Sequence, residues 1–212
     1  MQVRILGSAA GGGVPQWNCR CPNCAAARDG SPDVRPRTQS SVAVSADGRA
    51  WFLLNVSPDV RQQILAFPEL GPPEDQQRGT AIAGCVLTDA ELDHTAGLLL
   101  LREGTPLQVF STSVVRRCLS TIFPIQLILT AFSPGGWTVL PLDEFIDLTE
   151  PDGSRSGLRI QAFPLGDHFP RFIQGRGGPG SVVGLLVQDE KTGGRLVYAP
   201  GVEGIFPGLK DA

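Results

Sequence analysis

This sequence of 212 residues has no long apolar run, no excess of positive charge and only two histidines. Its apolar runs, such as 98–101, are far shorter than the roughly 20 residues that are needed to cross a membrane. The stretch 1–6 is too short for the apolar core of a signal peptide and is followed by Gly7. A net charge of −3 with scattered arginines excludes the basic face that nucleic-acid-binding proteins usually carry. We therefore expect a cytoplasmic protein with no membrane segment and no nucleic-acid partner.

The composition is that of a folded chain with many turns. Apolar residues make up 42% and charged residues 18%, which excludes a disordered chain. The 26 glycines and 18 prolines indicate short elements rather than a helical bundle. A chain of this length can form one sizeable core or two small ones.

The predicted elements favour an α/β fold of the α+β kind, in which two mixed sheets lie between helices. Strands are expected at 3–6, 41–44, 51–55, 82–87, 107–110, 138–140, 158–165, 182–188 and 195–198. Helices are expected from Pro58, after His94 and at 114–122. The first of these helices has a predicted apolar side made of Val60, Ile64, Leu65 and Phe67.

Three of the five cysteines form the strongest local pattern, Cys19-x-Cys21-x-x-Cys24. Disulfides are not expected in a reducing compartment. Three thiolates this close together in a loop can bind one zinc ion, which prefers four such ligands. The alternative is three unrelated surface thiols. Cys85 and Cys118 lie in apolar patterns and are interpreted as core residues.

A second cluster combines acids with one of the two histidines. Asp89, Glu91, Asp93 and His94 follow a predicted buried strand and precede a helix. Crowded carboxylates repel one another unless a cation or protons neutralise them. The alternative is that the acids cap the helix and interact with its dipole. Capping accounts for one or two of these acids, and a metal site accounts better for three beside a histidine.

Two loops lie where strands are predicted to end. His168 follows the expected strand 158–165, and strand ends are where sheet-based sites collect their ligands; a lone loop histidine is also often an ordinary surface residue. The run Gly11-Gly12-Gly13 lacks the Gly-Lys-Ser/Thr of a phosphate-binding loop. We interpret it as a close-approach turn beside the active site.

The sequence at 88–97, TDAELDHTAG, resembles the metallo-β-lactamase superfamily motif Thr-His-x-His-x-Asp-His-x-x-Gly. Asp89 and Glu91 stand where the motif has its first two histidines. The stretch 52–64 is similar to the second-strand segment, and His168-x-Pro170 falls where the third metal motif is expected. The stretches 6–19, 37–41, 87–101 and 198–201 narrow the resemblance to the coenzyme PQQ synthesis B proteins (PQQ, pyrroloquinoline quinone), over nearly the whole chain.

The resemblance implies a metallo-β-lactamase-like αββα sandwich. It implies a single domain over 1–212, with a zinc-binding Cys loop at 15–37. The chains of the family normally continue past the point where this one stops, and the continuation carries a late histidine. We therefore expect that the domain lacks its C-terminal portion.

The resemblance also implies a catalytic Fe²⁺ in addition to the structural Zn²⁺. In the superfamily one metal is bound by the motif's Asp, its final His and the late histidine. A carboxylate with two histidines is typical of non-haem Fe(II) oxygenases. Asp93 and His94 would then be direct ligands, Glu91 and His168 ligands or neighbours of ligands, and Asp89 the weakest candidate. Asp93, His94 and Glu91 are the expected catalytic residues.

Three functions follow as alternatives from the resemblance. The first is hydroxylation of the tyrosine ring in the Glu-Tyr-derived PQQ precursor. Other PQQ biosynthesis proteins are the expected partners in that case, and a homodimer is the expected assembly. The second is a non-catalytic carrier of PQQ or its precursor toward the periplasm. The third is a zinc hydrolase of the metallo-β-lactamase type, against which the replacement of both motif histidines argues.

Overall fold

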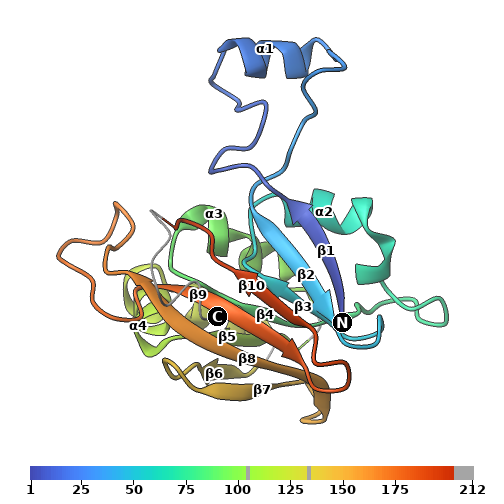
Figure 1. Ribbon diagram of the computed structural model, residues 1–212, viewed down its shortest axis with the longest axis vertical. Helices are drawn as coiled ribbons and strands as arrows, with labels where there is room; N and C mark the ends of the chain where they lie inside the picture. The colour runs from blue at the N-terminus through green and yellow to red at the C-terminus, as the bar shows by residue number, and fades with distance from the viewer. Residues whose placement is uncertain (104–105, 133–134, 203–212) are drawn as a thin grey trace.

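Two β-sheets that pack face to face make up most of the structure (Figure 1). The computed structural model describes residues 1–103, 106–132 and 135–202. The first sheet has six strands in the order β1 (Gln2–Gly7), β2 (Ser41–Ser45), β3 (Trp51–Leu54), β4 (Ile82–Val86), β5 (Gln108–Ser111) and β6 (Trp137–Val139). It is mixed, because β1 to β3 pair antiparallel and β3 to β6 pair parallel.

The second sheet has four strands, all of which pair antiparallel. Their order is β10 (Arg195–Tyr198), β9 (Val182–Asp189), β8 (Arg155–Gly166) and β7 (Phe145–Thr149). The predicted pair of sheets is thus confirmed, with the mixed pairing confined to the first. The expectation of a shortened C-terminal portion depends on the stretch 203–212. This stretch lies outside the described residues.

Alternating side chains along each strand build two separate cores. In β3, Trp51 and Leu53 face the helices, while Phe52 and Leu54 face the second sheet, and all four are buried. The inward residues of β9 also enter the core between the sheets. Each fully buried side chain of this size contributes roughly 1.5–3 kcal/mol to folding. These two cores hold the strands in register and so fix the positions of the loops at their ends.

The described helices pack against the six-stranded sheet (Figure 1). They are α1 (Pro22–Arg28), α2 (Val60–Ala66), α3 (Leu92–Thr95), α4 (Ser113–Arg117) and α5 (Ile125–Phe132), with short helical turns η1 (Pro68–Leu70), η2 (Ala96–Leu101) and η3 (Cys118–Ile122). The exception is α1, which stands away from both sheets at the tip of an arm formed by residues 14–37. We call this segment the Cys arm.

Several predicted elements differ from the observed ones. The leucine-rich helix after His94 is only one turn of α-helix, α3, continued by the 3₁₀ turn η2, and the helix predicted at 114–122 ends in the π-helical turn η3. The elements α1, α5 and β7 were not predicted, because their apolar periods are short or irregular. In α2 the predicted apolar face was partly wrong, since Leu65 is 67% exposed and Gln63 is buried in its place.

The loop after β3 fixes the turn that carries His94. The backbone N–H of Val56 donates to the His94 carbonyl at 2.7 Å, and that of Gly97 donates to the Val56 carbonyl at 3.0 Å. A Cβ atom at Gly97 would lie 2.1 Å from the Ser57 carbonyl oxygen. Glycine is therefore required three residues after His94, because only its backbone fits against Ser57.

Among the residues described, no single helix is both long and apolar enough to cross a membrane. One bent pair, Ser113–Ile122 with Ile125–Phe132, meets the criteria of length and composition together, with a 78° bend between its halves.

The variant Gly97→Ala should lose about 3 kcal/mol of unfolding free energy, because its methyl group overlaps backbone atoms that the loop cannot easily move. Urea unfolding followed by circular dichroism measures the loss. Gly178→Ala is the matched control, since a Cβ atom there meets nothing within 4 Å. Equal stabilities of the two variants would contradict the requirement for close approach.

A second prediction concerns acid stability. Buried Asp189, at the end of β9, forms an ion pair with the α-amino group of Met1 and accepts hydrogen bonds from the backbone N–H groups of Lys191 and Thr192. The Met1 amino group, followed by the Thr192 hydrogen bond, holds the pKa of Asp189 well below its usual range. A lowered folded-state pKa gives stability above the ordinary value of about 4, and this stability is lost as the pH falls.

We therefore expect Asp189→Asn to be less stable than the native protein at pH 7, with the difference shrinking progressively below about pH 4. Urea midpoints measured between pH 7 and pH 3 test this, with exposed Asp33→Asn as the control. A difference that is constant with pH would show that the charge of Asp189 contributes nothing.

Candidate metal centre

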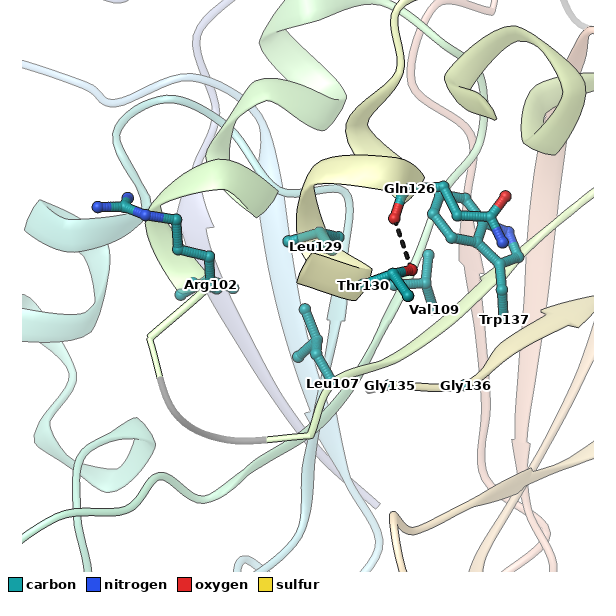
Figure 2. A pocket seen from close by; sticks show the side chains of 10 residues that line it. Arg102, Leu107, Val109, Gln126, Leu129, Thr130, Gly135, Gly136 and Trp137 are labelled. Atoms are coloured by element: carbon teal, nitrogen blue, oxygen red, sulfur yellow. Dashed lines mark hydrogen bonds between the residues drawn. The ribbon is translucent and has the colours of Figure 1, made fainter. Parts of the chain in front are cut away.

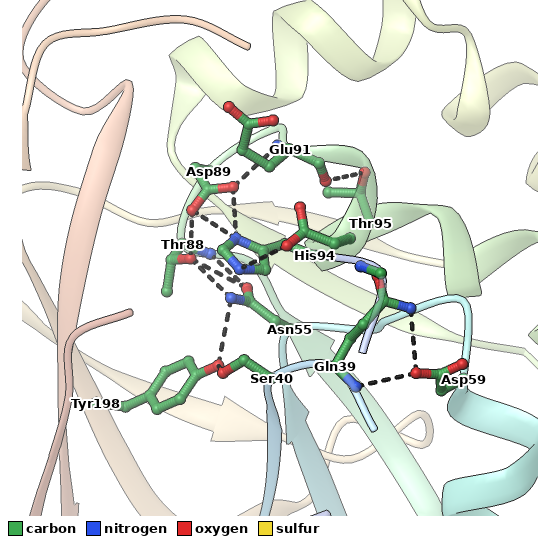
Figure 3. Close-up of polar contacts among 12 residues, drawn as sticks. Gln39, Ser40, Asn55, Asp59, Thr88, Asp89, Glu91, His94, Thr95 and Tyr198 are labelled. Carbon is green, nitrogen blue, oxygen red and sulfur yellow. Dashed lines mark hydrogen bonds and ion pairs between the residues drawn. The ribbon is translucent and has the colours of Figure 1, made fainter. Parts of the chain in front are cut away.

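The loop between β4 and α3 brings Asp89 and His94 together (Figure 3). Nδ1 of His94 lies 2.8 Å from both carboxylate oxygens of Asp89. Both side chains are buried, with 3% of Asp89 and 9% of His94 exposed. The Thr88 hydroxyl and the Glu91 backbone N–H also donate to Asp89, at 2.8 and 2.9 Å. Asp89 is thus a fully hydrogen-bonded buried carboxylate.

The Asp89–His94 contact determines the protonation of both groups. Burial alone would raise the pKa of Asp89, but the hydrogen bond and charge of His94 outweigh it, so that the pKa is lowered. Burial alone would lower the pKa of His94, but the hydrogen bond and charge of Asp89 outweigh it, so that this pKa is raised. Because an ionised carboxylate only accepts hydrogen bonds, Nδ1 of His94 is the donor and Nε2 is the ring nitrogen left for a ligand.

Asp93 lies on the other side of the ring. Its Oδ2 atom is 3.9 Å from Nε2 of His94, so that an oxygen and a nitrogen donor face the same space. Asp93 is also close to the glycine-rich loop, because a Cβ atom at Gly11 would lie 3.2 Å from Oδ2 of Asp93. The predicted close-approach turn is therefore confirmed at Gly11, and the next two glycines have positive φ angles of 91° and 71°.

Glu91 and His168 lie at the edge of the same region. Burial, followed by the negative charges of Asp89 and Asp93, raises the pKa of Glu91. The charge of His168 acts on Glu91 in the opposite sense, and His168 itself is exposed at the end of β8. Three carboxylates in mutual repulsion beside two imidazoles favour the binding of a cation.

Capping of α3 does not account for these acids. Glu91 occupies the N-cap position but makes no side-chain capping hydrogen bond, and Asp89 is engaged with His94. The structure does not, however, gather the five predicted residues into one tight group. Within the described ranges, only Cys19, Cys21 and Cys24 place three potential ligand atoms within 4.8 Å of one another. The assignment of Asp89, Glu91, Asp93, His94 and His168 to a metal stays a prediction.

Gln39 connects the glycine-rich loop to Asp59, and Figure 3 shows the bonds between Gln39 and Asp59. Gln39, which is buried, accepts from the Gly12 backbone N–H at 3.1 Å. Its own backbone and side-chain N–H groups donate to Oδ2 of Asp59 at 2.9 and 3.1 Å. Asp59 thereby connects the start of α2 to the loop that lies against Asp93.

A second group of polar residues, which the sequence patterns did not indicate, consists of Asn55, Ser40 and Tyr198. Asn55 and Thr88 follow the carboxyl ends of the adjacent parallel strands β3 and β4, and Tyr198 ends β10 of the other sheet (Figure 3). Burial raises the pKa of Tyr198 to about 12, so that its hydroxyl stays protonated. The useful clue in the sequence is a polar residue within two positions of the end of each of two buried parallel strands.

The Cys arm holds the three predicted zinc ligands in one place. Cys21 is the N-cap of α1, and buried Cys24 lies in its first turn. The backbone N–H of Gln16 points to the Cys24 sulfur at 3.4 Å. Hydrogen bonds from the Cys24 backbone and from the neighbouring thiols lower the pKa of Cys21, which favours a thiolate. This arrangement can bind a zinc ion, at about 2.3 Å for each sulfur. Cys85 and Cys118 are buried, as predicted for core residues.

The small cavity of Figure 2 does not belong to this site. Its lining includes Leu107 before β5, Gly136 before β6 and Leu129 of α5, at the amino-terminal edge of the parallel strands. The candidate metal centre lies at their carboxyl-terminal edge. A volume of about 30 Å³ has room for little more than one water molecule.

Comparisons with known proteins agree with the fold. Residues 50–210 match the family described as the Beta-lactamase superfamily domain. Coenzyme PQQ synthesis protein B of Ectopseudomonas mendocina (strain ymp) is 47% identical over 207 residues, which cover 95% of this chain and 66% of that protein. The protein of the same name from Pseudomonas syringae pv. tomato is 45% identical over 220 residues, which cover 100% of this chain and 71% of the relative.

A solved structure is also similar over the whole chain. The crystal structure of Zn²⁺-bound PqqB from Methylobacterium extorquens has a TM-score of 0.87 and 39% identity. The match covers 100% of this chain and 69% of the Methylobacterium chain. The present chain spans 66% of the length of the Ectopseudomonas protein, just under two thirds.

A prediction follows for the Cys arm. Cys21→Ser should abolish one equivalent of bound zinc, because two thiolates alone cannot hold the ion. Elemental analysis after dialysis against a weak chelator measures the metal. Cys118→Ala is the matched control, since this buried cysteine lies in the helical core away from the arm. Unchanged zinc in Cys21→Ser, or its loss in the control, would contradict the assignment.

Proposed function

The chain belongs to the coenzyme PQQ synthesis protein B family of the β-lactamase superfamily, and on this premise we propose that it acts in PQQ biosynthesis as an iron-dependent hydroxylase. The substrate is the precursor derived from cross-linked Glu and Tyr. The reaction inserts one oxygen atom of dioxygen into a ring C–H bond of the tyrosine, and two electrons from an added reductant convert the other oxygen atom to water. The Cys arm has a structural role, with Cys19, Cys21 and Cys24 as zinc ligands.

One observation carries the iron proposal, namely the placement of Nε2 of His94 and Oδ2 of Asp93 in the same space. The hydrogen bond to Asp89 leaves the lone pair of Nε2 free, so that the residues present fit a metal ion. The side chains around this space are rich in carboxylates and poor in histidine, which favours Fe²⁺ over the nitrogen-rich set of a zinc hydrolase. Bound Fe²⁺ would supply the activation of dioxygen.

The residues of the chain itself have separate roles in this proposal. His94 and Asp93 bind the ion, and Asp89 holds the His94 ring through its hydrogen bond to Nδ1. Glu91 is half-buried, and burial followed by the charges of Asp89 and Asp93 raises its pKa, so that it is a candidate proton donor or acceptor at the edge of the site. His168 is exposed at the same edge and is placed to contact an incoming anionic substrate or to complete the ligand set.

A zinc hydrolase of the same fold is the second candidate. The Methylobacterium structure that is similar to this chain throughout its length is Zn²⁺-bound, and the hydrolase requires zinc at His94 and Asp93 as well as in the Cys arm. In that case His94 and Asp93 would hold Zn²⁺, which would supply the activation of water, and Glu91 would exchange a proton at the edge of the site; the reaction would consume no dioxygen. The two candidates therefore differ in the source of the oxygen atom in the product.

The decisive experiment uses the protein purified without oxygen, loaded with Fe²⁺ and given the Glu-Tyr-derived precursor under isotope-labelled dioxygen. We expect the label in the product, and we expect Asp93→Asn and His94→Gln to lower iron content and turnover more than 100-fold, on the order of the loss of a metal ligand. Zinc bound to the Cys arm should be unaffected. Exposed Glu69→Gln is the control.

Two outcomes would overturn the hydroxylase. Label from water, with zinc in both sites, would identify a hydrolase. Absence of turnover, combined with tight PQQ binding by a metal-free Asp93→Asn/His94→Gln double variant, would identify a carrier.

A further inference from the structure

Asn55 has an unusual backbone at the end of β3. Its φ angle is +61°, and Asp143 is the only other non-glycine residue with positive φ in the described ranges. This left-handed conformation costs about 1 kcal/mol, although asparagine tolerates it better than most residues. The surrounding strands enforce it, because the Asn55 N–H donates to Val86 of β4 and its carbonyl accepts from the Ser41 hydroxyl of β2, both at 2.8 Å. Such strain clusters at functional sites.

The strained backbone aims a fully buried amide at the candidate metal centre (Figure 3). Oδ1 of Asn55 accepts from the Thr88 backbone N–H at 3.0 Å. Nδ2 donates to the Thr88 hydroxyl oxygen at 2.9 Å and to the Tyr198 hydroxyl at 3.4 Å. Both amide protons and the amide oxygen therefore have partners. Because the Tyr198 hydroxyl oxygen accepts from Asn55, its proton can be donated to the Ser40 hydroxyl oxygen at 3.0 Å.

The direction of these bonds determines which proton reaches Asp89. The Thr88 hydroxyl accepts from Nδ2 of Asn55 and has one proton to donate. Of its two possible acceptors, Oδ2 of Asp89 at 2.8 Å is nearer than Oδ1 of Asn55 at 3.2 Å, and Oδ1 of Asn55 already accepts from the Thr88 backbone N–H. The Thr88 hydroxyl and the Glu91 N–H both donate to the Asp89 carboxylate and hold it in place, so that it faces Nδ1 of His94. An aspartate at position 55 could donate nothing to Thr88, which would then turn its proton away from Asp89. The chain of bonds works only with an amide at this position.

We propose that Asn55 is a positioning residue of the metal centre, which acts through Thr88 and Asp89 to hold neutral His94 with its proton on Nδ1 and its Nε2 lone pair facing Asp93. This role rests on the proposed metal site, but it does not depend on which metal binds or which reaction follows. It also connects the two sheets, because Tyr198 of β10 contacts the same amide. The site is thereby tied to the packing of one sheet on the other.

Nitrogen NMR of the metal-free protein with labelled histidine tests the proposal. The chain has two histidines, so that exposed His168 serves as an internal control. In the native protein at a pH where His94 is neutral, we expect its proton on Nδ1. In Asn55→Asp and Thr88→Val we expect a mixture of both tautomers. Thr88→Ser, which keeps the hydroxyl, should restore the native spectrum.

Metal affinity gives an independent readout. With the Cys arm already loaded with zinc, Fe²⁺ affinity should fall about 10- to 100-fold in Asn55→Asp and Thr88→Val, which is typical for a lost partner of a metal ligand. Thr88→Ser should bind within a few-fold of the native protein. Circular dichroism shows whether Asn55→Asp folds. If it does not, the comparison of Thr88→Val with Thr88→Ser tests the proposal without it.

A native tautomer and native Fe²⁺ affinity in folded Thr88→Val would overturn the proposal. A tautomer change in Asn55→Asp and Thr88→Val, with no metal binding by the native protein, would instead support the positioning role and contradict the proposed metal site. The two failures are thus distinguishable.

Discussion

The hydrogen bond between Asp89 and His94 is the constraint on which the candidate site depends. A buried carboxylate is costly unless several donors surround it, and Asp89 has donors from the imidazole, from a hydroxyl and from a backbone N–H. Because the carboxylate can only accept, it fixes the orientation of the ring and leaves Nε2 facing Asp93. Without this bond the ring could rotate, and the 3.9 Å approach of His94 to Asp93 would have no structural cause.

The fold supplies the partners of this bond from segments far apart in the sequence. Parallel strands β3 and β4 end side by side, which places Asn55 next to Thr88, and the second sheet contributes Tyr198 and the Val183 N–H, which donates to the Thr88 carbonyl. Gly97 lets the turn that carries His94 lie directly on the loop after β3. The two cores therefore set the geometry of the site as well as its stability.

The sequence predicted the elements with strong patterns and missed those that depend on context. The strand 195–198 was predicted with its observed bounds, and the Cys19-x-Cys21-x-x-Cys24 spacing indicated sulfurs that do lie together. The resemblance of the motif at 88–97 made Asp93 a predicted direct ligand and Asp89 the weakest candidate. It did not show that Asp89 contacts Nδ1 of His94 while Asp93 faces Nε2, because this depends on side-chain direction. Asn55 escaped notice because its role comes from a positive φ angle and from partners 33 and 143 residues away.

The most direct test of this account is anomalous X-ray diffraction at the iron edge from crystals of the Fe²⁺-loaded protein. We expect one iron peak in contact with Nε2 of His94 and the carboxylate of Asp93, while Asp89 remains hydrogen-bonded to Nδ1. An ion bound to Asp89 in place of His94, or an iron-soaked crystal with no peak near either residue, would contradict it.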